Sequence, residues 1–162
     1  MNLSTAEQLT LKNSVLADPV LSLLPQSADN AFEIARVYNL ASSPAYIVWR
    51  SQVTADETGN AWNGTDIDGM SSLNMQRLQL LLASSRDGVY DMRRSDRRDG
   101  FENPFGANVN NASRVAMRTA WKRTATRAEA LFATGTGSDA TPAITTQEGT
   151  LSYLDVQSAM GW

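Results

Sequence analysis

Residues 111–135 read NASRVAMRTAWKRTATRAEALFATG, and we predict that they form one long helix. A cap near Asn110 or Asn111 begins it, and Gly135 provides a left-handed C-cap. Its apolar residues recur every three or four positions on one face: Met117, Trp121, Ala125, Ala128 and Phe132. About 22 residues at about 1.5 Å each give a rod of roughly 33 Å. We expect this rod to be the spine of a mainly α, compact helical bundle.

Capping signals mark further helices on the N-terminal side of this stretch. Ser4-x-x-Glu7 and Thr54-x-x-Glu57 have the pattern of capping boxes. The first helix should end at Asp18, because the residue before a proline avoids the α region, and Asp18 then caps a short second helix. The remaining helices are expected after Ser27, running to about Leu40, and after Ser71 or Ser72.

Two segments are less regular. Ser43–Pro44 resembles a cap followed by a first-turn proline and favours a helix over 45–50, although these aromatic and β-branched residues also suit a buried strand. Residues 84–110 are polar and interrupted by glycine and proline. Within them, Phe101 and Phe105 are expected to pin the segment onto the core.

The composition changes after the predicted long helix. We therefore divide the chain into a helical body, residues 1–135, and an extended C-terminal arm, residues 136–162. A small β-hairpin is an alternative for Ala143–Thr146 with Thr150–Tyr153, and Ser152-x-x-Asp155 caps a short last helix. The arm has too few apolar residues for a core of its own. Its deletion is expected to leave the body folded.

The absence of cysteine and histidine limits the chemistry of the chain. It excludes Ser-His and Cys-His nucleophilic pairs and the commonest transition-metal ligand. Asp66–Gly69 fails the spacing of a calcium loop, and Gly135-x-Gly137 lacks the third glycine of a dinucleotide motif. We expect a protein that is not an enzyme and that has no cofactor and no metal. No apolar run approaches the length of a membrane span.

The charge is uneven, although the formal net charge is only −3. Residues 93–127 hold nine basic and three acidic residues, a balance of +6, whereas the rest holds five and fourteen, a balance of −9. Two basic ridges are expected on the long helix: Arg114, Arg118 and Lys122, then Arg123 and Arg127. They could face a neighbouring subunit or the phosphates of DNA. The pI of 4.9 argues against a free-standing DNA-binding protein.

The arm carries the residues that we expect to bind a partner. They are Leu151, Tyr153, Leu154, Val156, Met160 and Trp162. A terminal aromatic such as Trp162 is difficult to bury in its own domain, so it could act as a docking plug.

Three stretches resemble a family of small proteins from tailed phages and prophages. They are Ser43–Arg50, Lys122–Gly137, and Thr141–Ala143 followed by Glu148–Val156, and they cover about a quarter of the chain. Residues 56–110 depart from the family pattern, apart from a loosely kept turn around Trp62. The resemblance implies a structural virion protein, and the outline of a helical body with an arm is similar to head-to-tail adaptors, also called connector or neck proteins.

An adaptor of this kind forms a homo-oligomeric ring of about twelve copies in the virion, beneath the portal and between capsid and tail. The resemblance implies binding to the portal protein, to neighbouring copies and to a further neck or tail protein below, after synthesis in the host cytoplasm. A stopper or tail-completion role is a variant of this expectation. The alternative function is a DNA-contacting packaging or accessory protein that uses the arginine-rich helix, with non-specific contact to DNA.

Overall fold

The computed structural model describes residues 1–84 and 87–162 and divides the chain into two compact units. Unit 1 comprises Met1–Val48 and Thr124–Trp162, and unit 2 comprises Trp49–Arg123. In the described part of the chain, 52 % of the residues are helical and 11 % are in strands, so the prediction of a mainly α protein is confirmed. The division differs from the expected one, because the C-terminal residues belong to the same unit as the N-terminal helices.

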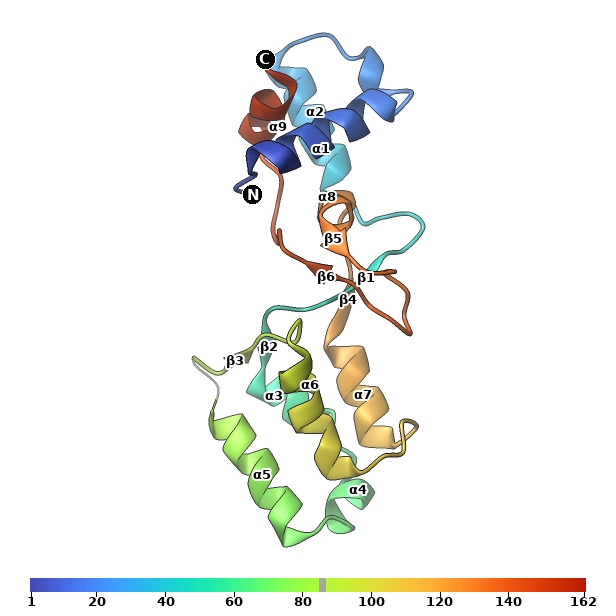
Figure 1. The fold of residues 1–162 in the computed structure, drawn as a ribbon, viewed down its shortest axis with the longest axis vertical. Coiled ribbons are helices and arrows are strands. Elements are labelled where there is room, and N and C mark those ends of the chain that lie inside the picture. Colours follow the sequence, from blue (N-terminus) through green and yellow to red (C-terminus); the bar gives the residue numbers. More distant parts are fainter. Residues whose placement is uncertain (85–86) are drawn as a thin grey trace. The chain divides into compact units, whose positions relative to one another are not determined.

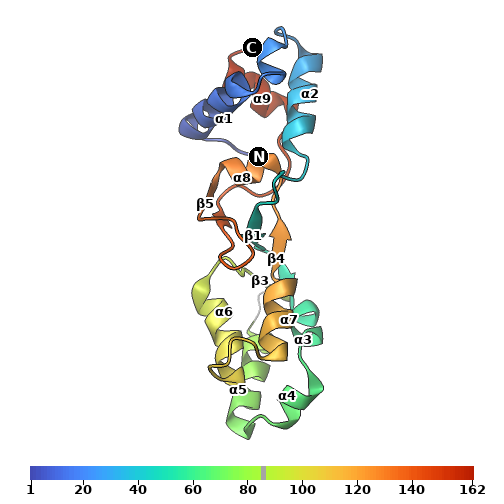
Figure 2. The ribbon, with the colours of Figure 1, turned by 90° about the vertical axis from the view of Figure 1, so that its right-hand side faces the viewer.

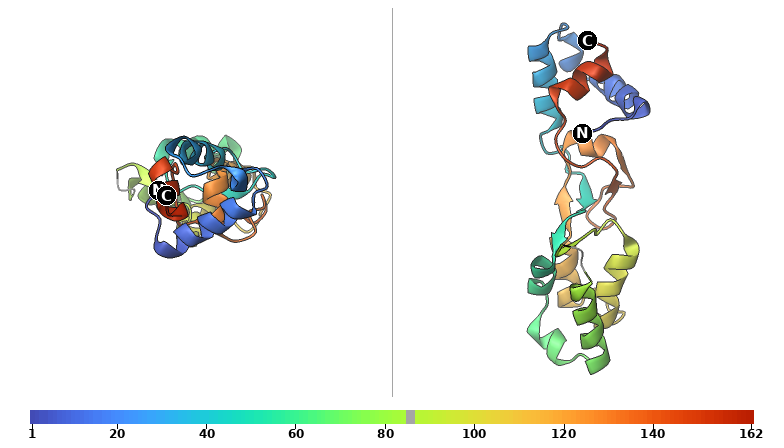
Figure 3. Two further views of the ribbon diagram at one scale, coloured as in Figure 1. Left: turned by 90° about the horizontal axis from the view of Figure 1, so that it is seen from above. Right: turned by 90° about the vertical axis from the view of Figure 1, so that its left-hand side faces the viewer.

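Unit 1 is built from three main helices, and both chain ends lie in it (Figure 3). Its elements are α1 (Thr5–Ala17), the 3-10 helix η1 (Leu21–Leu23), α2 (Ala28–Tyr38), α8 (Arg127–Leu131), β5 (Ala133–Thr134), β6 (Ile144–Thr145) and α9 (Tyr153–Met160). The last helix, α9, packs against α1 and α2 (Figure 1). The antiparallel strands β5 and β6 pair Ala133 with Thr145.

Unit 2 is a second small helical assembly, in which α5, α6 and α7 lie close together (Figure 2). Its elements are β2 (Val53–Thr54), α3 (Ala55–Asn60), α4 (Gly64–Asp68), α5 (Ser72–Ala83), β3 (Val89–Tyr90), α6 (Ser95–Glu102), the 3-10 helix η2 (Asn103–Phe105) and α7 (Ala112–Ala120). Strands β2 and β3 are antiparallel. Two further strands, β1 (Ile47–Trp49) and β4 (Lys122–Thr124), pair with each other, and the unit boundaries fall within them.

Each unit has its own hydrophobic core. The main core of unit 1 includes Leu11, Val15, Ile34, Tyr38, Leu151 and Val156, all at most 2 % exposed. The core of unit 2 includes Leu78, Met92, Phe101, Met117 and Trp121, all fully buried. The expectation that Phe101 and Phe105 hold their polar segment on the core is confirmed, because both pack in this cluster.

The predicted caps are confirmed at most helix starts. Ser4 with Glu7 and Thr54 with Glu57 form complete capping boxes. The side chain of Ser27 accepts the N–H of Asn30, and that of Ser71 accepts the N–H of Asn74. Because a cap depends on residues three positions apart, the sequence alone is enough to identify it.

The predicted long helix is wrong. Residues 111–135 form α7, β4, α8 and β5 in succession. The N–H of Ala125 donates to the carbonyl of Tyr46 at 2.8 Å, so it does not continue the helix from Trp121. Thr126 then caps α8, with its hydroxyl accepting the N–H of Glu129 at 3.1 Å. The apolar stripe still marks burial, because Met117, Trp121, Ala125 and Ala128 are all fully buried.

The preference for a helix after Ser43–Pro44 is also wrong. The peptide bond before Pro44 is cis, and Ile47–Trp49 form strand β1. The N–H of Ile47 donates to the carbonyl of Gly137 at 2.7 Å, and its carbonyl accepts the N–H of Ala143 at 2.9 Å. These long-range backbone bonds favour the extended form, which the β-branched and aromatic composition also suits.

Residues 136–162 do not form an extended arm. Their strand β6 pairs with β5, so no hairpin forms within the segment. The last helix begins as predicted, with a capping box between Ser152 and Asp155. Since α9 completes the core of unit 1, the segment is a part of that unit.

Candidate interaction surface

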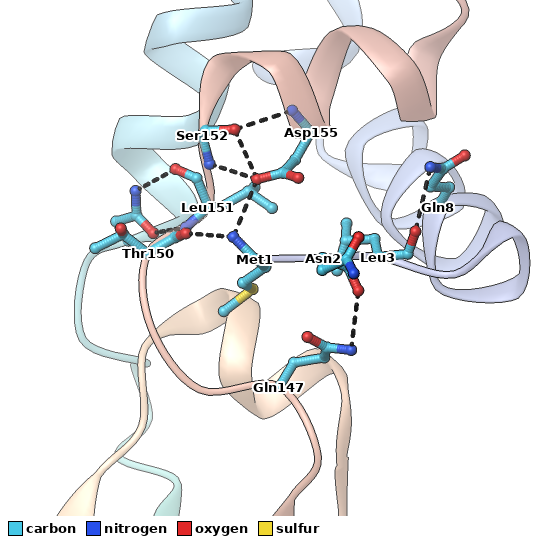
Figure 4. A network of polar contacts seen from close by, with 10 residues as sticks. Met1, Asn2, Leu3, Gln8, Gln147, Thr150, Leu151, Ser152 and Asp155 are labelled. Atoms are coloured by element: carbon cyan, nitrogen blue, oxygen red, sulfur yellow. Dashed lines mark hydrogen bonds and ion pairs between the residues drawn. The ribbon is translucent and has the colours of Figure 1, made fainter.

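The start of α9 is fixed by a polar network that joins both ends of unit 1 (Figure 4). The ammonium group of Met1 donates to the carbonyl of Thr150 at 2.8 Å and to Asp155 Oδ2 at 3.2 Å. Burial alone would raise the pKa of Asp155, but the hydrogen bonds from Ser152 and the ammonium of Met1 lower it below its usual range. A carboxylate with so many donors holds α9 firmly in one orientation.

Asn39 fixes the segment just before α9. Its side-chain amide donates to the carbonyl of Leu151 at 2.9 Å, and its side-chain oxygen accepts the N–H of Leu151 at 2.7 Å. Gln147 adds a hydrogen bond to the carbonyl of Asn2 at 3.4 Å (Figure 4). It also binds Glu7 Oε1 at 3.0 Å. Residues far apart in the sequence therefore hold the C-terminal segment in place.

The six predicted partner-binding residues fall into three groups. Leu151 and Val156 are 2 % and 0 % exposed, so their side chains belong to the core of their own unit and are not available to a partner. Tyr153, Met160 and Trp162 are half-buried and pack against the same core. Leu154 remains, with 58 % of its surface exposed.

An aromatic residue that contacts α9 was missed by the sequence reasoning. Phe32 in α2 is 59 % exposed, and its ring stacks on that of Tyr153 with centroids 4.6 Å apart. We call Phe32, Tyr153 and Leu154 the α2–α9 surface. Phe32 lies off the apolar stripe that contains Ile34 and Tyr38, and an aromatic residue outside the buried stripe is a signal that could have identified it.

The predicted basic ridges are divided by the break in the long helix. In unit 2, Arg114 and Arg118 both bind Glu102, with Arg114 Nη2 at 2.7 Å and Arg118 Nη2 at 2.6 Å from Glu102 Oε2. Burial alone would raise the pKa of Glu102, but hydrogen bonds and charge from Arg118 and Arg114 lower it. Lys122 and Arg123 are half-buried in β4.

Arg127 forms an ion pair within unit 1. Its guanidinium lies 3.1 Å from Asp18 Oδ2 and stacks over the ring of Tyr38, 5.0 Å from the ring centroid. The charges of Arg114, Arg118 and Arg127 are therefore matched within their own units. These contacts give no row of open cations for phosphates, and contact with DNA stays a prediction.

The arginine side chains around the start of α6 also have partners nearby. Arg93 binds Asp91 at 2.8 Å, and Arg94 binds Asp96 at 2.6 Å. Arg98 stacks over Trp49, 4.3 Å from the ring centroid, and burial lowers its pKa. Such pairs suit a structural role for these side chains.

The carboxylates of Asp66 and Glu57 bind other groups of the protein itself. Asp66 Oδ2 accepts the hydroxyl of Ser113 at 2.7 Å and its N–H at 3.0 Å, which ties α4 to α7. Glu57 completes the α3 capping box and binds Arg50 at 2.8 Å. Among residues 1–84 and 87–162, no group of three or more acidic residues is arranged to hold a metal ion. No helix in the same ranges is long and apolar enough to span a membrane.

Comparisons with known proteins add no family to this description. No family model, no curated protein and no solved structure matches the chain.

Proposed function

We propose that the protein is a structural component of a tailed-phage virion, a head-to-tail adaptor that forms a ring beneath the portal. The proposal starts from the resemblance of Ser43–Arg50, Lys122–Gly137 and the C-terminal stretch to small virion proteins. It treats the chain as an interaction protein, whose function lies in the surfaces that it offers to its neighbours.

The observation that carries the proposal is that the three resembling stretches meet in space. Tyr46 accepts the N–H of Ala125 at 2.8 Å, and Ile47 binds both Gly137 and Ala143 through its backbone. Val48, Ala125 and Ala143 then form a small core of their own, and each is at most 1 % exposed. Segments separated by up to about 95 residues therefore share one substructure, as expected if the resemblance reflects a common framework.

The charge distribution between the units supports a ring. By sequence, unit 1 holds three basic and eight acidic residues, a balance of −5, whereas unit 2 holds eleven and nine, a balance of +2. Closed rings use heterologous contacts, in which two different surfaces of one chain meet. Surfaces of opposite charge favour such contacts and disfavour contacts between like surfaces.

The α2–α9 surface is the part of unit 1 that we assign to the portal. Phe32 and Leu154 expose 59 % and 58 % of their area, and aromatic anchors are enriched at the centres of interfaces. Its framework is rigid, because α9 is fixed by the network around Asp155. Binding therefore costs little ordering of the helix.

Cross-linking mass spectrometry on purified particles of the phage that encodes the chain tests the proposal. The chain has only two lysines, Lys12 and Lys122, so a carbodiimide that joins carboxylates to amines is the suitable reagent. We expect cross-links from Asp29 or Glu33, which flank Phe32 in α2, to portal lysines. Cross-links to tail proteins alone would replace the adaptor role with a stopper or tail-completion role, and absence from the particle would overturn the structural assignment.

A matched pair of variants tests the portal surface. Leu154→Asp is expected to reduce incorporation into particles, because it places a charge on an exposed apolar position of the α2–α9 surface. Leu9→Asp is the control, since Leu9 is 57 % exposed in α1 of the same unit. Equal incorporation of the two variants would remove this surface from the proposal.

A further inference from the structure

Unit 1 presents two bare aliphatic side chains beside its short 3-10 helix. Val20 and Leu23 expose 70 % and 80 % of their surface. We call these two residues the η1 knob. Single exposed apolar residues are common. Val20 is the N-cap residue of η1 and Leu23 is its last residue, and residues three positions apart are aligned at a 3-10 turn.

The η1 knob is held rigidly. Asp18 Oδ1 accepts the N–H groups of Val20 at 3.0 Å and Leu21 at 3.1 Å. These backbone hydrogen bonds lower the pKa of Asp18, so its carboxylate stays charged and capping. Between the two exposed residues, Leu21 is 5 % exposed and anchors η1 in the core. A knob that is already ordered loses little conformational freedom on binding.

Unit 2 carries a hollow of matching character between α5, α6 and η2. Its volume is about 350 Å³, and it is lined by Arg77, Leu80, Leu81, Gly100, Asn103 and Pro104. We call it the α5–α6 hollow. Leu80 on its wall is 70 % exposed, so the hollow presents apolar surface to solvent. Its volume is at the lower end of the range for binding pockets, large enough for aliphatic side chains.

A glycine keeps this hollow open. Gly100 lies inside helix α6, where glycine is less favourable than alanine. A Cβ at this position would lie 3.5 Å and 3.6 Å from the two methyl carbons of Leu81, which is ordinary van der Waals contact. Alanine therefore fits sterically, and its absence leaves space at the wall of the hollow.

The charges of the two units indicate which surface binds in the hollow. The charged side chain on its wall is that of Arg77, and unit 2 as a whole has a balance of +2. The η1 knob belongs to unit 1, whose balance is −5. Of the three acidic residues at positions 13–35, Asp18 and Glu33 pair with Arg127 and Arg36, so the negative balance is that of the unit as a whole. A unit of negative balance with an apolar knob complements a unit of positive balance with an apolar hollow.

We propose that the η1 knob of one copy inserts into the α5–α6 hollow of a second copy. This contact is heterologous, because it joins two different surfaces of the same chain. The inference deepens the proposed function, on which it rests for the closure of such contacts into a ring. It assigns the contact between subunits to the η1 knob and leaves the α2–α9 surface for the portal.

Engineered cysteines test the contact directly, because the chain has no cysteine of its own. Purified Leu23→Cys and Leu80→Cys variants are mixed under mild oxidation. We expect the mixed disulfide dimer to form faster than either homodimer. The controls are Leu9→Cys in α1 and Leu73→Cys in α5, since Leu9 and Leu73 are each 57 % exposed and lie outside the knob and the hollow. If Leu23→Cys joins Leu73→Cys as fast as Leu80→Cys, the inference is overturned.

A second measurement uses blocked surfaces. Leu23→Glu removes the knob and Leu80→Glu blocks the hollow, so each variant alone is expected to stay monomeric in sedimentation velocity. Their mixture should give a dimer that grows no further. Each mixed pair has only one intact knob and one intact hollow, and these two bind each other. A mixture that stays monomeric at concentrations where the unaltered chain associates would contradict the proposal, as would an unaltered chain that stays monomeric throughout.

The variant Gly100→Ala tests binding at the hollow without destabilising the fold. It should keep or raise the stability of α6, yet weaken the contact about fourfold, the factor given by one methyl group of apolar burial, about 0.8 kcal/mol. Unchanged cross-linking between Leu23→Cys and a Leu80→Cys/Gly100→Ala variant would argue against insertion at this wall. All of these measurements use purified protein. A negative result would therefore rule out this contact without ruling out a place in the virion. Absence of the protein from the particle would rule out the adaptor role without ruling out this contact.

Discussion

The ring of Phe32 in α2 lies flat on the ring of Tyr153 in α9, with centroids 4.6 Å apart and planes 10° from parallel. Such pairs contribute about 0.5–1.5 kcal/mol beyond the area that they bury. Together with the buried side chains of Leu151 and Val156, the pair makes α9 part of the core of unit 1. The C-terminal segment is therefore expected to be needed for folding as well as for binding.

Two leucines three residues apart test this role of the C-terminal segment. Leu151→Ala should lower the free energy of unfolding by about 2–5 kcal/mol, because Leu151 is 2 % exposed in a packed core. Leu154→Ala should change it by less than about 0.5 kcal/mol, because Leu154 is 58 % exposed. Urea denaturation followed by circular dichroism measures both. Equal stability of the two variants would restore the idea of a detachable arm.

The buried ion pairs of Glu102 give a second prediction. Glu102→Gln leaves Arg114, which is 8 % exposed, without its counter-charge, so unit 2 should lose about 3–5 kcal/mol. Glu33→Gln is the control, because Glu33 pairs with Arg36 at an exposed position, and it should leave the unfolding midpoint unchanged. An equal change in the unfolding midpoint of the two variants would show that burial does not strengthen the ion pairs of Glu102.

The same carboxylate predicts a pH dependence. The folded protein lowers the pKa of Glu102 below its ordinary value of 4.5, so the charged form stabilises the fold fully above that value. This contribution is lost as the pH falls through the lowered pKa. The difference in stability between the unaltered chain and Glu102→Gln should therefore be constant at neutral pH and narrow below about pH 4.5. A difference in stability that is independent of pH would contradict a lowered pKa of Glu102 in the folded protein.

Much of the local structure could be predicted from the sequence, because helix caps depend on neighbouring residues. The starts of α1, α2, α5 and α9 and the caps at Ser4, Ser27, Ser71 and Ser152 are examples. The burial of Trp121 and Ala125 also followed from their spacing. The mainly α character rests on these local signals, and it is confirmed.

Long-range contacts explain what could not be predicted. Strand β4 interrupts the expected helix because it pairs with β1, about 75 residues earlier, and no local pattern encodes that partner. Similarly, α9 packs in unit 1 with its start held by Asn39 and Met1, which are far away in the sequence, although its own segment is poor in apolar residues. Of the predicted partner-binding residues, Leu154 is still largely exposed, whereas Phe32 and the α5–α6 hollow required the fold.

Thr126 distinguishes the observed break from the predicted continuous helix. In the structure its hydroxyl caps α8 by accepting the N–H of Glu129, so Thr126→Ala should destabilise unit 1 by about 1 kcal/mol. In a continuous helix the same change would stabilise, because alanine is the better helix former. The sign of the change in the denaturation midpoint decides between them. Thr126→Ser keeps the hydroxyl and should stay close to the unaltered chain.

The close packing of Gly137 against Tyr46 leads to the last prediction. Gly137 has a φ of +65°, and a Cβ there would collide with the ring of Tyr46, whose hydroxyl donates to the carbonyl of Gly135 at 2.7 Å. Gly137→Ala should therefore cost about 3 kcal/mol, from a left-handed backbone and a displaced ring. Gly161→Ala, with a φ of +75° and no atom within 4 Å of the added Cβ, should cost only about 1 kcal/mol.

A double-mutant cycle with Tyr46 identifies the cause of this loss. Tyr46→Ala removes the ring that the new methyl group would strike, so Gly137→Ala should cost about 1–2 kcal/mol less in that background. Thermal unfolding of the four proteins gives the coupling. If the two costs simply add, the ring is not what excludes a side chain at Gly137. In that case the backbone conformation alone would account for the glycine, and the segment would pack more loosely on Tyr46 than its contacts indicate.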